Sequence, residues 1–370
     1  MHNKLTTILF AMILTGMLGS QLLPDRSFSE QENRYLEQLP KFTMRNLWNG
    51  RWMKSFETYV QDQFIGRDEW IKLKGELEKG IGKQENNGIY FGKKQWYYEV
   101  MEAPDEAVLN SNLAALQKIG ESLRKKGIAA KFLAIYSAYQ FHQDQLPKNH
   151  RNIDQAWLTQ MIQDQTNMEV LDTFETLQAH KEENIYFRTD HHWTQLGAYY
   201  TYVMLGESLG FDPLPLASYQ KVVSDKPFYG SLFAKSPLFG DLGEEVWTLE
   251  DGKEYTVSIP DAKTTKQGLY DYTYFQKGDQ YSVYLGGNQA EVIIHGEHKN
   301  QKTLVLFKDS YSHALAPLLA QHYETVILID LRYFNQSISQ YLDTVRPDEV
   351  LFSYNVSWFG NDTYFKKIRS

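Results

Sequence analysis

A serine stands just past the end of a predicted strand, in a setting where α/β proteins often place reactive groups. The apolar run Thr303–Phe307 is followed by Lys308, Asp309 and Ser310, and a helix is predicted to begin at Ser312. Reactive groups of open parallel sheets lie on loops past the carboxyl ends of the strands. A backbone N–H at a helix N-terminus could also receive an oxyanion, because partial positive charge gathers there. The alternative is that Ser310 or Ser312 only caps the helix.

A second polar group lies in the segment Tyr186–Thr194, which contains Asp190, His191 and His192 in a row. In an extended segment, residues two apart point the same way, so Asp190 and His192 are predicted to share a face and His191 to point elsewhere. An aspartate that orients an imidazole, which in turn acts on a serine, would activate a nucleophile. Two alternatives stay open. Asp190 and both histidines could ligate a metal ion, or they could form a satisfied polar network.

A third candidate follows the predicted strand Glu349–Ser353. Asn355 would lie at the tip of this strand, and its carboxamide could donate to a developing oxyanion. Asparagine is also common in turns, so a structural role is equally compatible with the pattern. Two other polar residues are predicted to be structural. His313 is expected at the surface of the helix after Ser310, and Asn288 in a Gly-Gly-Asn turn.

Alternating helices and strands must position these groups from about residue 105 onward. The predicted helices are Glu106–Lys126, Gln155–Gln165, Thr194–Leu209, Ser312–Gln321 and Ile338–Val345, and the predicted strands are Ile128–Tyr136, Glu169–Asp172, Thr303–Phe307, Thr325–Ile329 and Glu349–Ser353. This alternation predicts an α/β fold with a parallel sheet covered by helices on both faces. Short β-type runs between about 215 and 300 predict an inserted antiparallel section, with strands at Tyr255–Ile259, Gln280–Leu285 and Glu291–His295.

The N-terminal residues resemble a targeting segment. Leu5–Leu23 is uncharged over nineteen residues, and at 1.5 Å per residue it would span roughly 28 Å, about the thickness of a bilayer core. A basic residue precedes this run and Asp25 follows it, so the remaining chain is predicted to lie outside the cytoplasm. We therefore predict a signal peptide or signal anchor over 1–24, a helical and hairpin region over 25–100, and a catalytic domain over 101–370.

The composition excludes several classes of protein and site. Hydrophobic residues make up 42% of the 370 residues and charged residues 23%, which is typical of a globular chain. The net charge of −8 disfavours a nucleic-acid partner. The absence of cysteine excludes disulfides, thiolate metal sites and a cysteine nucleophile. Aromatic residues reach 14%, and such side chains suit surfaces that stack on sugar rings.

The stretch Thr189–Thr194, with the sequence TDHHWT, resembles the signature of the DHHW family. That family is similar to bacterial alginate O-acetylation proteins with an SGNH-hydrolase-like fold. The resemblance implies a circularly permuted order, in which an Asp-x-His pair precedes the serine. Asp190 and His192 match that pair, and Ser310 matches the nucleophile of the Gly-Asp-Ser block, with Lys308 in place of the usual glycine.

The resemblance also implies partners for the oxyanion. Asn355 matches the asparagine of the last SGNH block, although Val356 stands where an aspartate is usual. Arg332 and Tyr333 lie where the second block usually has a glycine, and one of them is expected to take over its role in holding the oxyanion or substrate.

The activity that the resemblance implies is transfer of an acetyl group through an acyl-serine, without a metal or another cofactor. The substrate would be a cell-surface or exported polysaccharide, either as acceptor in an O-acetyltransferase or as ester in an acetylesterase. A membrane-bound O-acyltransferase would be the donor partner, and the protein would be membrane-anchored or secreted. Two alternatives remain, a non-catalytic envelope protein that binds glycans and a metal-dependent phosphoesterase that uses the Asp-His-His cluster.

Overall fold

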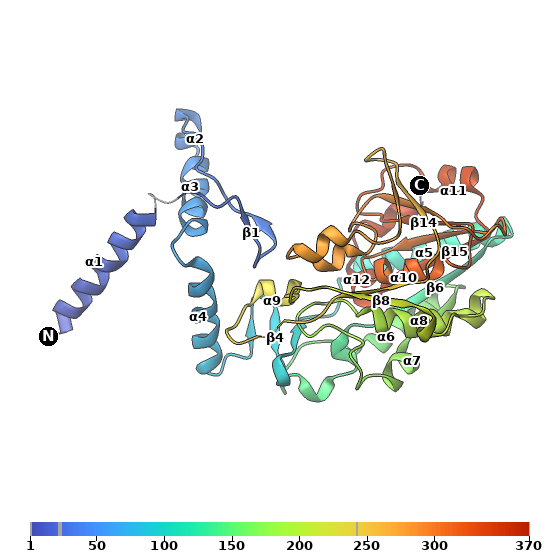
Figure 1. The fold of residues 1–370 in the computed structure, drawn as a ribbon, viewed down its shortest axis with the longest axis horizontal. Helices are drawn as coiled ribbons and strands as arrows, with labels where there is room; N and C mark the ends of the chain where they lie inside the picture. Colours follow the sequence, from blue (N-terminus) through green and yellow to red (C-terminus); the bar gives the residue numbers. More distant parts are fainter. Residues whose placement is uncertain (1, 21–23, 242, 370) are drawn as a thin grey trace. The chain divides into compact units, whose positions relative to one another are not determined.

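The computed structural model describes residues 2–20, 24–241 and 243–369, and Figure 1 shows its fold. The chain divides into two compact units. The first comprises Met1–Ile89 and Ser231–Asp241, and the second comprises Tyr90–Gly230 and Leu242–Ser370. All the candidate residues named above lie in the second unit. The domain bounds of 25–100 and 101–370 remain predictions.

The first unit consists of short helices and strands held together by ion pairs. Its elements are α1 (His2–Ser20), β1 (Phe28–Ser29), β2 (Arg34–Tyr35), α2 (Met44–Trp48), α3 (Arg51–Asp62), α4 (Arg67–Gly80), β3 (Glu85–Asn86) and α9 (Ser231–Lys235). The carboxylate of Asp62 is buried, and it accepts hydrogen bonds at 2.8 Å from the Arg34 guanidinium and from the Glu37 backbone N–H. Arg67 pairs with Glu32 at 2.8 Å. These contacts join β2 to α3 and join the turn between β1 and β2 to α4.

The predicted targeting segment lies partly in α1. Among the helices that the structure describes, none is both long enough and apolar enough to cross a membrane. The predicted run Leu5–Leu23 continues through residues 21–23, which lie outside the described residues. The signal or anchor therefore remains a prediction.

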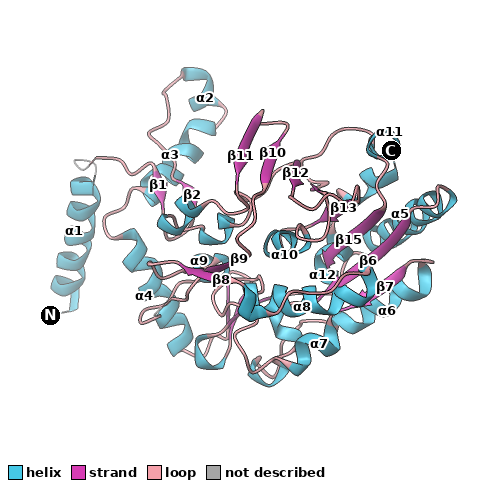
Figure 2. Cartoon of the chain, turned by 45° about the vertical axis from the view of Figure 1, so that its right-hand side comes forward, coloured by secondary structure: helices cyan, strands magenta, loops and turns pink. Residues whose placement is uncertain are grey.

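An eight-stranded sheet forms the centre of the second unit, with the strand order β11-β10-β12-β14-β13-β15-β6-β7 (Figure 2). The strands are β6 (Ala129–Ile135), β7 (Glu169–Asp172), β10 (Thr256–Ile259), β11 (Thr264–Gln267), β12 (Glu291–His295), β13 (Thr303–Lys308), β14 (Thr325–Ile329) and β15 (Glu349–Asn355). The five strands from β14 to β7 run parallel to one another. They are the five strands predicted from the alternating pattern.

The predicted antiparallel section lies mostly within this sheet. Strands β12, β10 and β11 extend its edge beyond β14 in antiparallel pairs, and β8 (Gln220–Val223) pairs with β9 (Trp247–Glu250) in a separate two-stranded sheet. The predicted strand Gln280–Leu285 is wrong, because Gln280–Val283 is a 3₁₀ helix. The chain turns sharply there, since Leu285 has a φ of 62° and the Gly286 N–H donates to the Ser282 carbonyl at 3.1 Å.

Helices cover both faces of the parallel strands. The helices of this unit are α5 (Glu106–Lys125), α6 (Gln155–Gln165), α7 (Phe174–Ala179), α8 (Gln195–Leu209), α10 (Ser312–Leu319), α11 (Ile338–Val345) and α12 (Val356–Asn361), and the predicted hairpin consists of β4 (Ile89–Phe91) and β5 (Tyr97–Glu99). The side chains of β13 and β15 are buried at every position after the first. Successive side chains of a strand point to opposite faces, so both faces of the sheet are covered.

The contacts between helices define two groups. One contains α5, α6 and α12, and the other contains α7, α8 and α10. Helix α8 begins immediately after the Asp-His-His segment, because the Thr194 hydroxyl accepts a hydrogen bond from the Leu196 N–H at 3.2 Å and caps the helix. The cap therefore fixes where the loop that carries the candidate histidines ends and α8 begins.

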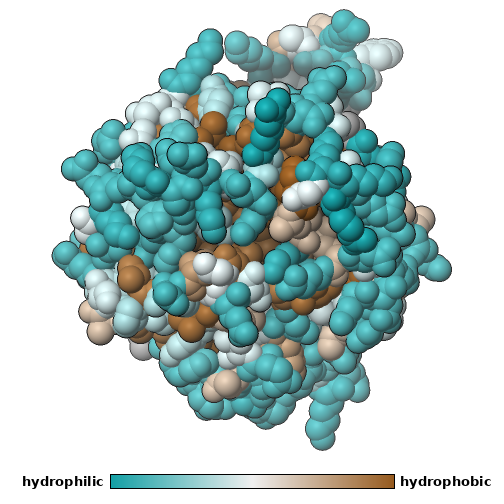
Figure 3. All heavy atoms as spheres, turned by 90° about the vertical axis from the view of Figure 1, so that its right-hand side faces the viewer, coloured by the Kyte–Doolittle hydropathy of each residue, from teal (hydrophilic) through white to brown (hydrophobic). Residues whose placement is uncertain are grey.

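The core stabilises this unit without any disulfide, since the sequence contains no cysteine. On the face drawn in Figure 3 most visible side chains are polar, and apolar residues show as separate patches. The apolar side chains of the central strands are buried instead, among them Leu306 in β13 and Phe352 in β15, which are both 0% exposed. The stability of the loop after β13 therefore depends on this core.

Replacing Leu306 with alanine tests that dependence. We expect Leu306→Ala to lower the free energy of unfolding by about 2–5 kcal/mol, because it removes buried methyl groups and leaves a cavity in the central strand. Leu216→Ala, at a position that is 37% exposed, should cost less than about 0.5 kcal/mol. Urea unfolding followed by circular dichroism measures both values. An equal cost at the two positions would contradict the assignment of β13 to the core.

Candidate active site

Ser310 lies two residues beyond β13, the strand between β14 and β15. Its hydroxyl is hydrogen-bonded to His192, with 2.7 Å between Oγ and Nε2. The alternative, that Ser310 or Ser312 only caps the following helix, is wrong for both serines. The N-cap of α10 is Tyr311, which makes no side-chain capping bond, and the Ser312 hydroxyl donates to Ser353 Oγ at 2.8 Å.

A continuous chain of hydrogen bonds joins Asp190, His192 and Ser310. Asp190 Oδ1 lies 2.6 Å from His192 Nδ1, and His192 Nε2 faces the serine. The imidazole and the serine are 118 residues apart in the sequence. Asp190 and His192 are buried, at 5% and 6% exposure, whereas Ser310 is partly exposed. This arrangement can orient the imidazole and allow it to take the proton of the serine.

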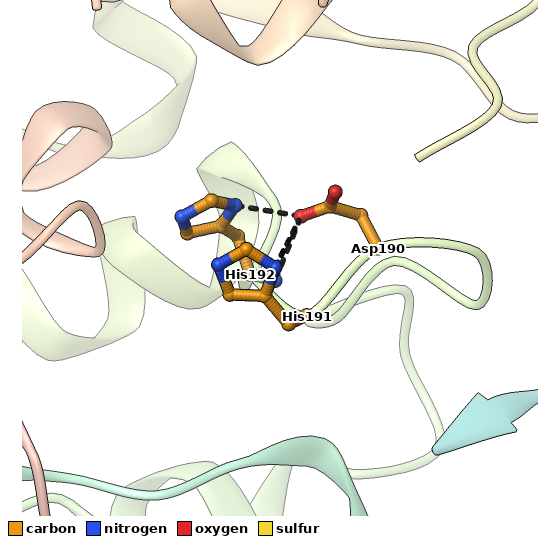
Figure 4. A group of neighbouring side chains, drawn as sticks. All are labelled: Asp190, His191 and His192. Carbon is orange, nitrogen blue, oxygen red and sulfur yellow. Dashed lines mark hydrogen bonds and ion pairs between the residues drawn. The ribbon is translucent and has the colours of Figure 1, made fainter. Parts of the chain in front are cut away.

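His191 lies beside the same carboxylate, as Figure 4 shows. Its Nδ1 is 3.7 Å from Asp190 Oδ1, and its ring centroid is 3.8 Å from that of His192. The prediction that His191 points elsewhere is therefore wrong. The segment is a tight turn, in which the His192 N–H donates to Asp190 Oδ1 at 3.0 Å, so the alternation of an extended strand does not apply.

Aromatic residues hold the imidazole and the serine in place. The Tyr281 ring stacks on His192, with centroids 3.8 Å apart and planes inclined by 6°. The Tyr281 hydroxyl donates to the carbonyls of Ser310 and Tyr311, each at 3.3 Å. Trp193 is fully buried, and its Nε1 donates to the Tyr311 carbonyl at 2.9 Å. The histidine loop and the serine loop are therefore joined at several points.

The loop that carries Asp190 is fixed by two further residues. The Glu244 carboxylate accepts hydrogen bonds from the N–H groups of Arg188 and Thr189, at 2.7 and 2.8 Å. Gly230 packs so closely that a Cβ there would lie 2.2 Å from the Asp190 Cβ and 2.6 Å from the Thr189 carbonyl. Only glycine fits at this position without moving the aspartate.

Burial determines the charge states beside the serine. It lowers the pKa of His192 to about 4, and nearby His191 acts in the same direction, whereas Asp190 opposes the shift. The His192 imidazole is therefore neutral near pH 7, as a general base requires. Burial also raises the pKa of Asp309 to about 6. This carboxylate accepts hydrogen bonds from the N–H groups of Tyr311 at 3.0 Å and Asn355 at 2.7 Å.

A buried cluster of charged residues lies directly before the serine. Lys308 Nζ donates to Asp330 Oδ2 at 3.0 Å and is 2.8 Å from His313 Nε2. The prediction of a surface position for His313 is wrong, since this residue is 3% exposed. Burial lowers the pKa values of both Lys308 and His313, and the lysine lowers that of the histidine further. Arg332 binds the same Asp330 carboxylate through Nε at 2.8 Å and Nη2 at 2.6 Å.

The structure places the three predicted oxyanion or substrate residues differently. Arg332 lines a cavity of about 360 Å³ together with Asp309, the residue before the serine. Tyr333 is 48% exposed, and its ring centroid lies 5.4 Å from the Arg332 Cζ. Tyr333 is not among the described residues that line this cavity.

Asn355 is fully buried and forms the N-cap of α12. Its Oδ1 accepts hydrogen bonds from the N–H groups of Ser357 and Trp358, and its Nδ2 donates to Ser137 Oγ at 3.0 Å. Its backbone N–H binds Asp309. These contacts bring Asn355 next to the serine loop, and they occupy most of its amide group.

A metal ion is the other ligand that the histidine loop could accept. Asp190, His191 and His192 each offer one ligand atom, and these three atoms lie within 4.8 Å of one another. Within residues 2–20, 24–241 and 243–369, this is the one group of His, Cys, Asp or Glu side chains close enough to hold a metal ion. Both nitrogens of His192, however, are already bonded to Asp190 and Ser310. A metal bound by His192 would have to replace one of these hydrogen bonds.

Sequence reasoning identified Asp190, His192 and Ser310, but it did not identify Tyr281, Glu244 or Gly230 as their neighbours. Trp193 could be identified from the sequence, because it is part of the TDHHWT hexamer. The other three lie far from the histidines in sequence, Gly230 and Glu244 outside the helices and strands and Tyr281 in the 3₁₀ helix Gln280–Val283. Only the folded chain brings them to the site.

Comparison with known proteins agrees with this fold. The family described as DHHW protein matches residues 112–329. The protein named probable alginate O-acetylase AlgJ from Pseudomonas syringae pv. tomato is 25% identical over an alignment of 213 residues, which covers 52% of this chain and 54% of that protein. The chain thus spans about half the length of the curated relatives that it matches.

Two solved structures share the fold. A DHHW family protein from Eubacterium siraeum has a TM-score of 0.67 and 22% identity, over 77% of this chain and 96% of that one. PatB1 from Bacillus cereus has a TM-score of 0.65 and 21% identity, over 75% of this chain and 98% of that one. These structures share the mixed α/β fold with its large, mostly parallel sheet. Because the family match covers more than half of the chain, the protein belongs to the DHHW family.

Proposed function

We propose that this protein is an extracytoplasmic serine acyl-transfer enzyme, an O-acetyltransferase or acetylesterase that acts on a cell-surface or exported polysaccharide. The observation that carries the proposal is the pair of hydrogen bonds that join His192 Nδ1 to the Asp190 carboxylate, which accepts at 2.6 Å, and Ser310 Oγ to His192 Nε2 at 2.7 Å. A buried neutral imidazole between a carboxylate and a partly exposed hydroxyl is the arrangement that activates a serine nucleophile.

The reaction would proceed in two halves through an acyl-serine. In the first, Ser310 Oγ attacks the acyl carbonyl carbon while His192 Nε2 takes its proton. The bond to the leaving group then breaks, and the leaving oxygen receives that proton. In the second, a sugar hydroxyl or water attacks the acyl-serine and gives its proton to His192. The bond to Ser310 Oγ then breaks, and the proton returns to the serine. Asp190 stabilises the imidazolium at each stage.

The oxyanion would be held by groups near the start of α10. The Ser310 N–H has no backbone acceptor among the described residues, so it is available to the developing charge. Arg332 is the favoured side-chain donor, because it lines the cavity beside Asp309. Asn355 and Tyr333 are less favoured, since the first is fully buried and engaged and the second lies away from the cavity lining. The circularly permuted SGNH-like order fits the position of Asp190 and His192 before Ser310.

The substrate and location rest on the relatives and on the N-terminal sequence. Three curated relatives are named probable alginate O-acetylase AlgJ, which supports transfer of an acetyl group to a polysaccharide. The uncharged run Leu5–Leu23 supports a signal peptide or membrane anchor. We further propose a membrane-bound O-acyltransferase as the donor partner, and no cofactor. A metal-dependent phosphoesterase remains the second candidate, because the three ligand atoms of the Asp-His-His cluster lie so close together.

Replacing the serine tests the mechanism directly. Ser310→Ala should lower the turnover of p-nitrophenyl acetate by roughly a thousandfold or more, because no acyl-enzyme can form. Ser312→Ala is the matched control, since it removes the same atom from a buried serine that bonds Ser353 instead. Mass spectrometry of the wild-type protein should find the acetyl group on Ser310. Equal turnover by the wild type and Ser310→Ala, with both proteins folded, would contradict the proposal and favour a glycan-binding protein.

Removal of metal ions separates the two candidate enzymes. We expect prolonged treatment with EDTA, followed by gel filtration, to leave p-nitrophenyl acetate turnover unchanged within about twofold, because every step uses protein groups alone. The same sample should show no phosphoesterase activity with bis-p-nitrophenyl phosphate before or after addition of Zn²⁺ or Mn²⁺. Phosphodiester cleavage that EDTA abolishes and Zn²⁺ restores would favour the metal-dependent enzyme instead.

The pH dependence of kcat/KM reports the pKa of the general base. His192 acts only when its imidazole is neutral, so kcat/KM should fall as the pH falls through its pKa. Because burial and His191 lower this pKa to about 4, the acidic limb should lie near pH 4 and not near the usual value of about 6.5. His191→Gln should move the limb upward, since it removes one of the three causes that lower the pKa, which are burial, His191 and Arg332. A wild-type limb at or above pH 6.5 would show that His192 is not the buried base.

A further inference from the structure

The cavity beside the serine has the size of a small-molecule site. Its volume is about 360 Å³, within the range of about 300–1,000 Å³ that is typical of ligand pockets. Its lining includes Asp309, which is adjacent to Ser310, and several residues of α12 and the turn that follows. A ligand in this cavity would therefore lie against Asp309, one residue before the proposed nucleophile.

Two exposed aromatic rings line the cavity. Trp358 is 39% exposed and Tyr364 is 47% exposed. Aromatic rings with accessible faces present flat apolar surfaces that suit the C–H face of a sugar ring, and the polar groups around them can bind its hydroxyls. The Trp358 ring also stacks on His191, with centroids 5.6 Å apart and planes inclined by 23°. The cavity wall is thus in direct contact with the Asp-His-His cluster.

The charges of the cavity disfavour an acidic ligand. Its two cationic side chains, Lys308 and Arg332, are both paired with Asp330. The lining contains four carboxylate side chains against these two cations, namely Glu99, Asp309, Asp330 and Asp362. Like charges repel at short range in a partly buried site, so a uronate would meet net negative charge. Hydroxyl groups would find acceptors in the carboxylates and a donor in Asn361, which also lines the cavity.

We propose that this cavity is the acceptor subsite for an uncharged pyranosyl unit of a glycan, whose ring stacks on Trp358. This inference rests on the proposed function, because the sugar hydroxyl would be the group that attacks the acyl-serine. Its oxygen bonds to the acyl carbon, its proton passes to His192 Nε2, and the bond to Ser310 Oγ breaks. Ser310 then recovers the proton, and the free enzyme and the O-acetylated sugar result.

The test measures sugar binding without turnover. Ser310→Ala of the full chain is titrated with cellopentaose, chitopentaose and a pentamer of galacturonate, and saturation-transfer NMR and calorimetry record binding. We expect at least one of the two neutral probes to bind, with the galacturonate pentamer at least about tenfold weaker. Adding Trp358→Ala to the Ser310→Ala variant should weaken its binding of the neutral oligosaccharides by about tenfold or more, and Trp358→Phe in its place should restore most of this affinity.

The matched control is Trp157→Ala in the same Ser310→Ala background. Trp157 is 47% exposed on α6, outside the cavity lining, so its removal should leave binding unchanged. Absence of neutral binding, equal binding by Trp358→Ala, or tighter binding of the galacturonate pentamer would each overturn the subsite. Circular dichroism excludes misfolding of the variants.

Failure of this inference can be distinguished from failure of the proposed function. Acetylation of Ser310 in the wild type, together with no neutral sugar binding that depends on Trp358, would overturn the subsite alone. Absence of acetyl-Ser310 in the wild type would overturn the acyl-transfer function, and the acceptor role with it. Neutral sugar binding lost in Trp358→Ala, together with acetyl-Ser310, would support both.

Discussion

The contact between the His192 imidazole and the Ser310 hydroxyl depends on two loops that are far apart in the sequence. One loop leads into α8 and the other follows β13. Each loop alone has a simple structural explanation, as a helix start or a strand end. The site exists because the Trp193 indole and the Tyr281 hydroxyl bond the backbone of the serine loop. These contacts keep the imidazole and the hydroxyl within 2.7 Å, and no disulfide contributes because the sequence contains no cysteine.

Regular elements were predictable because their apolar patterns are local. The bounds of β7, β14 and α11 agree with the predicted ranges. The prediction failed at Gln280–Leu285, where β-type residues lie in a 3₁₀ helix before a left-handed turn. Tyr281 of this segment packs on the histidine loop, since its ring stacks on His192. A β-type pattern cannot distinguish a side chain buried in a sheet from one buried beneath a loop.

The candidate triad was predictable for a different reason. Asp190, His192 and Ser310 each lie in a short motif with a recognisable order, and the structure brings these three together. The environment of His313 could not be predicted in this way. His313 lies on α10, whose residues are all buried, and its Nε2 is 2.8 Å from the side chain of Lys308, which a comparison of motifs treats only as a replacement for glycine. The direction of His191 also depended on a tight turn that the residue types alone do not indicate.

Lys308 has a structural consequence that extends to the substrate. A buried lysine needs a counter-charge, and Asp330 supplies it at 3.0 Å. The same carboxylate binds Arg332 through two nitrogens, so one aspartate shares its charge between both cations of the cavity. Burial alone would raise the pKa of Asp330, but Lys308 and Arg332 hold it below its ordinary value and keep the carboxylate ionised. A cation that is already paired attracts an acidic ligand less strongly. Lys308, which stands where the family usually has glycine, would therefore also affect which sugars the proposed subsite accepts.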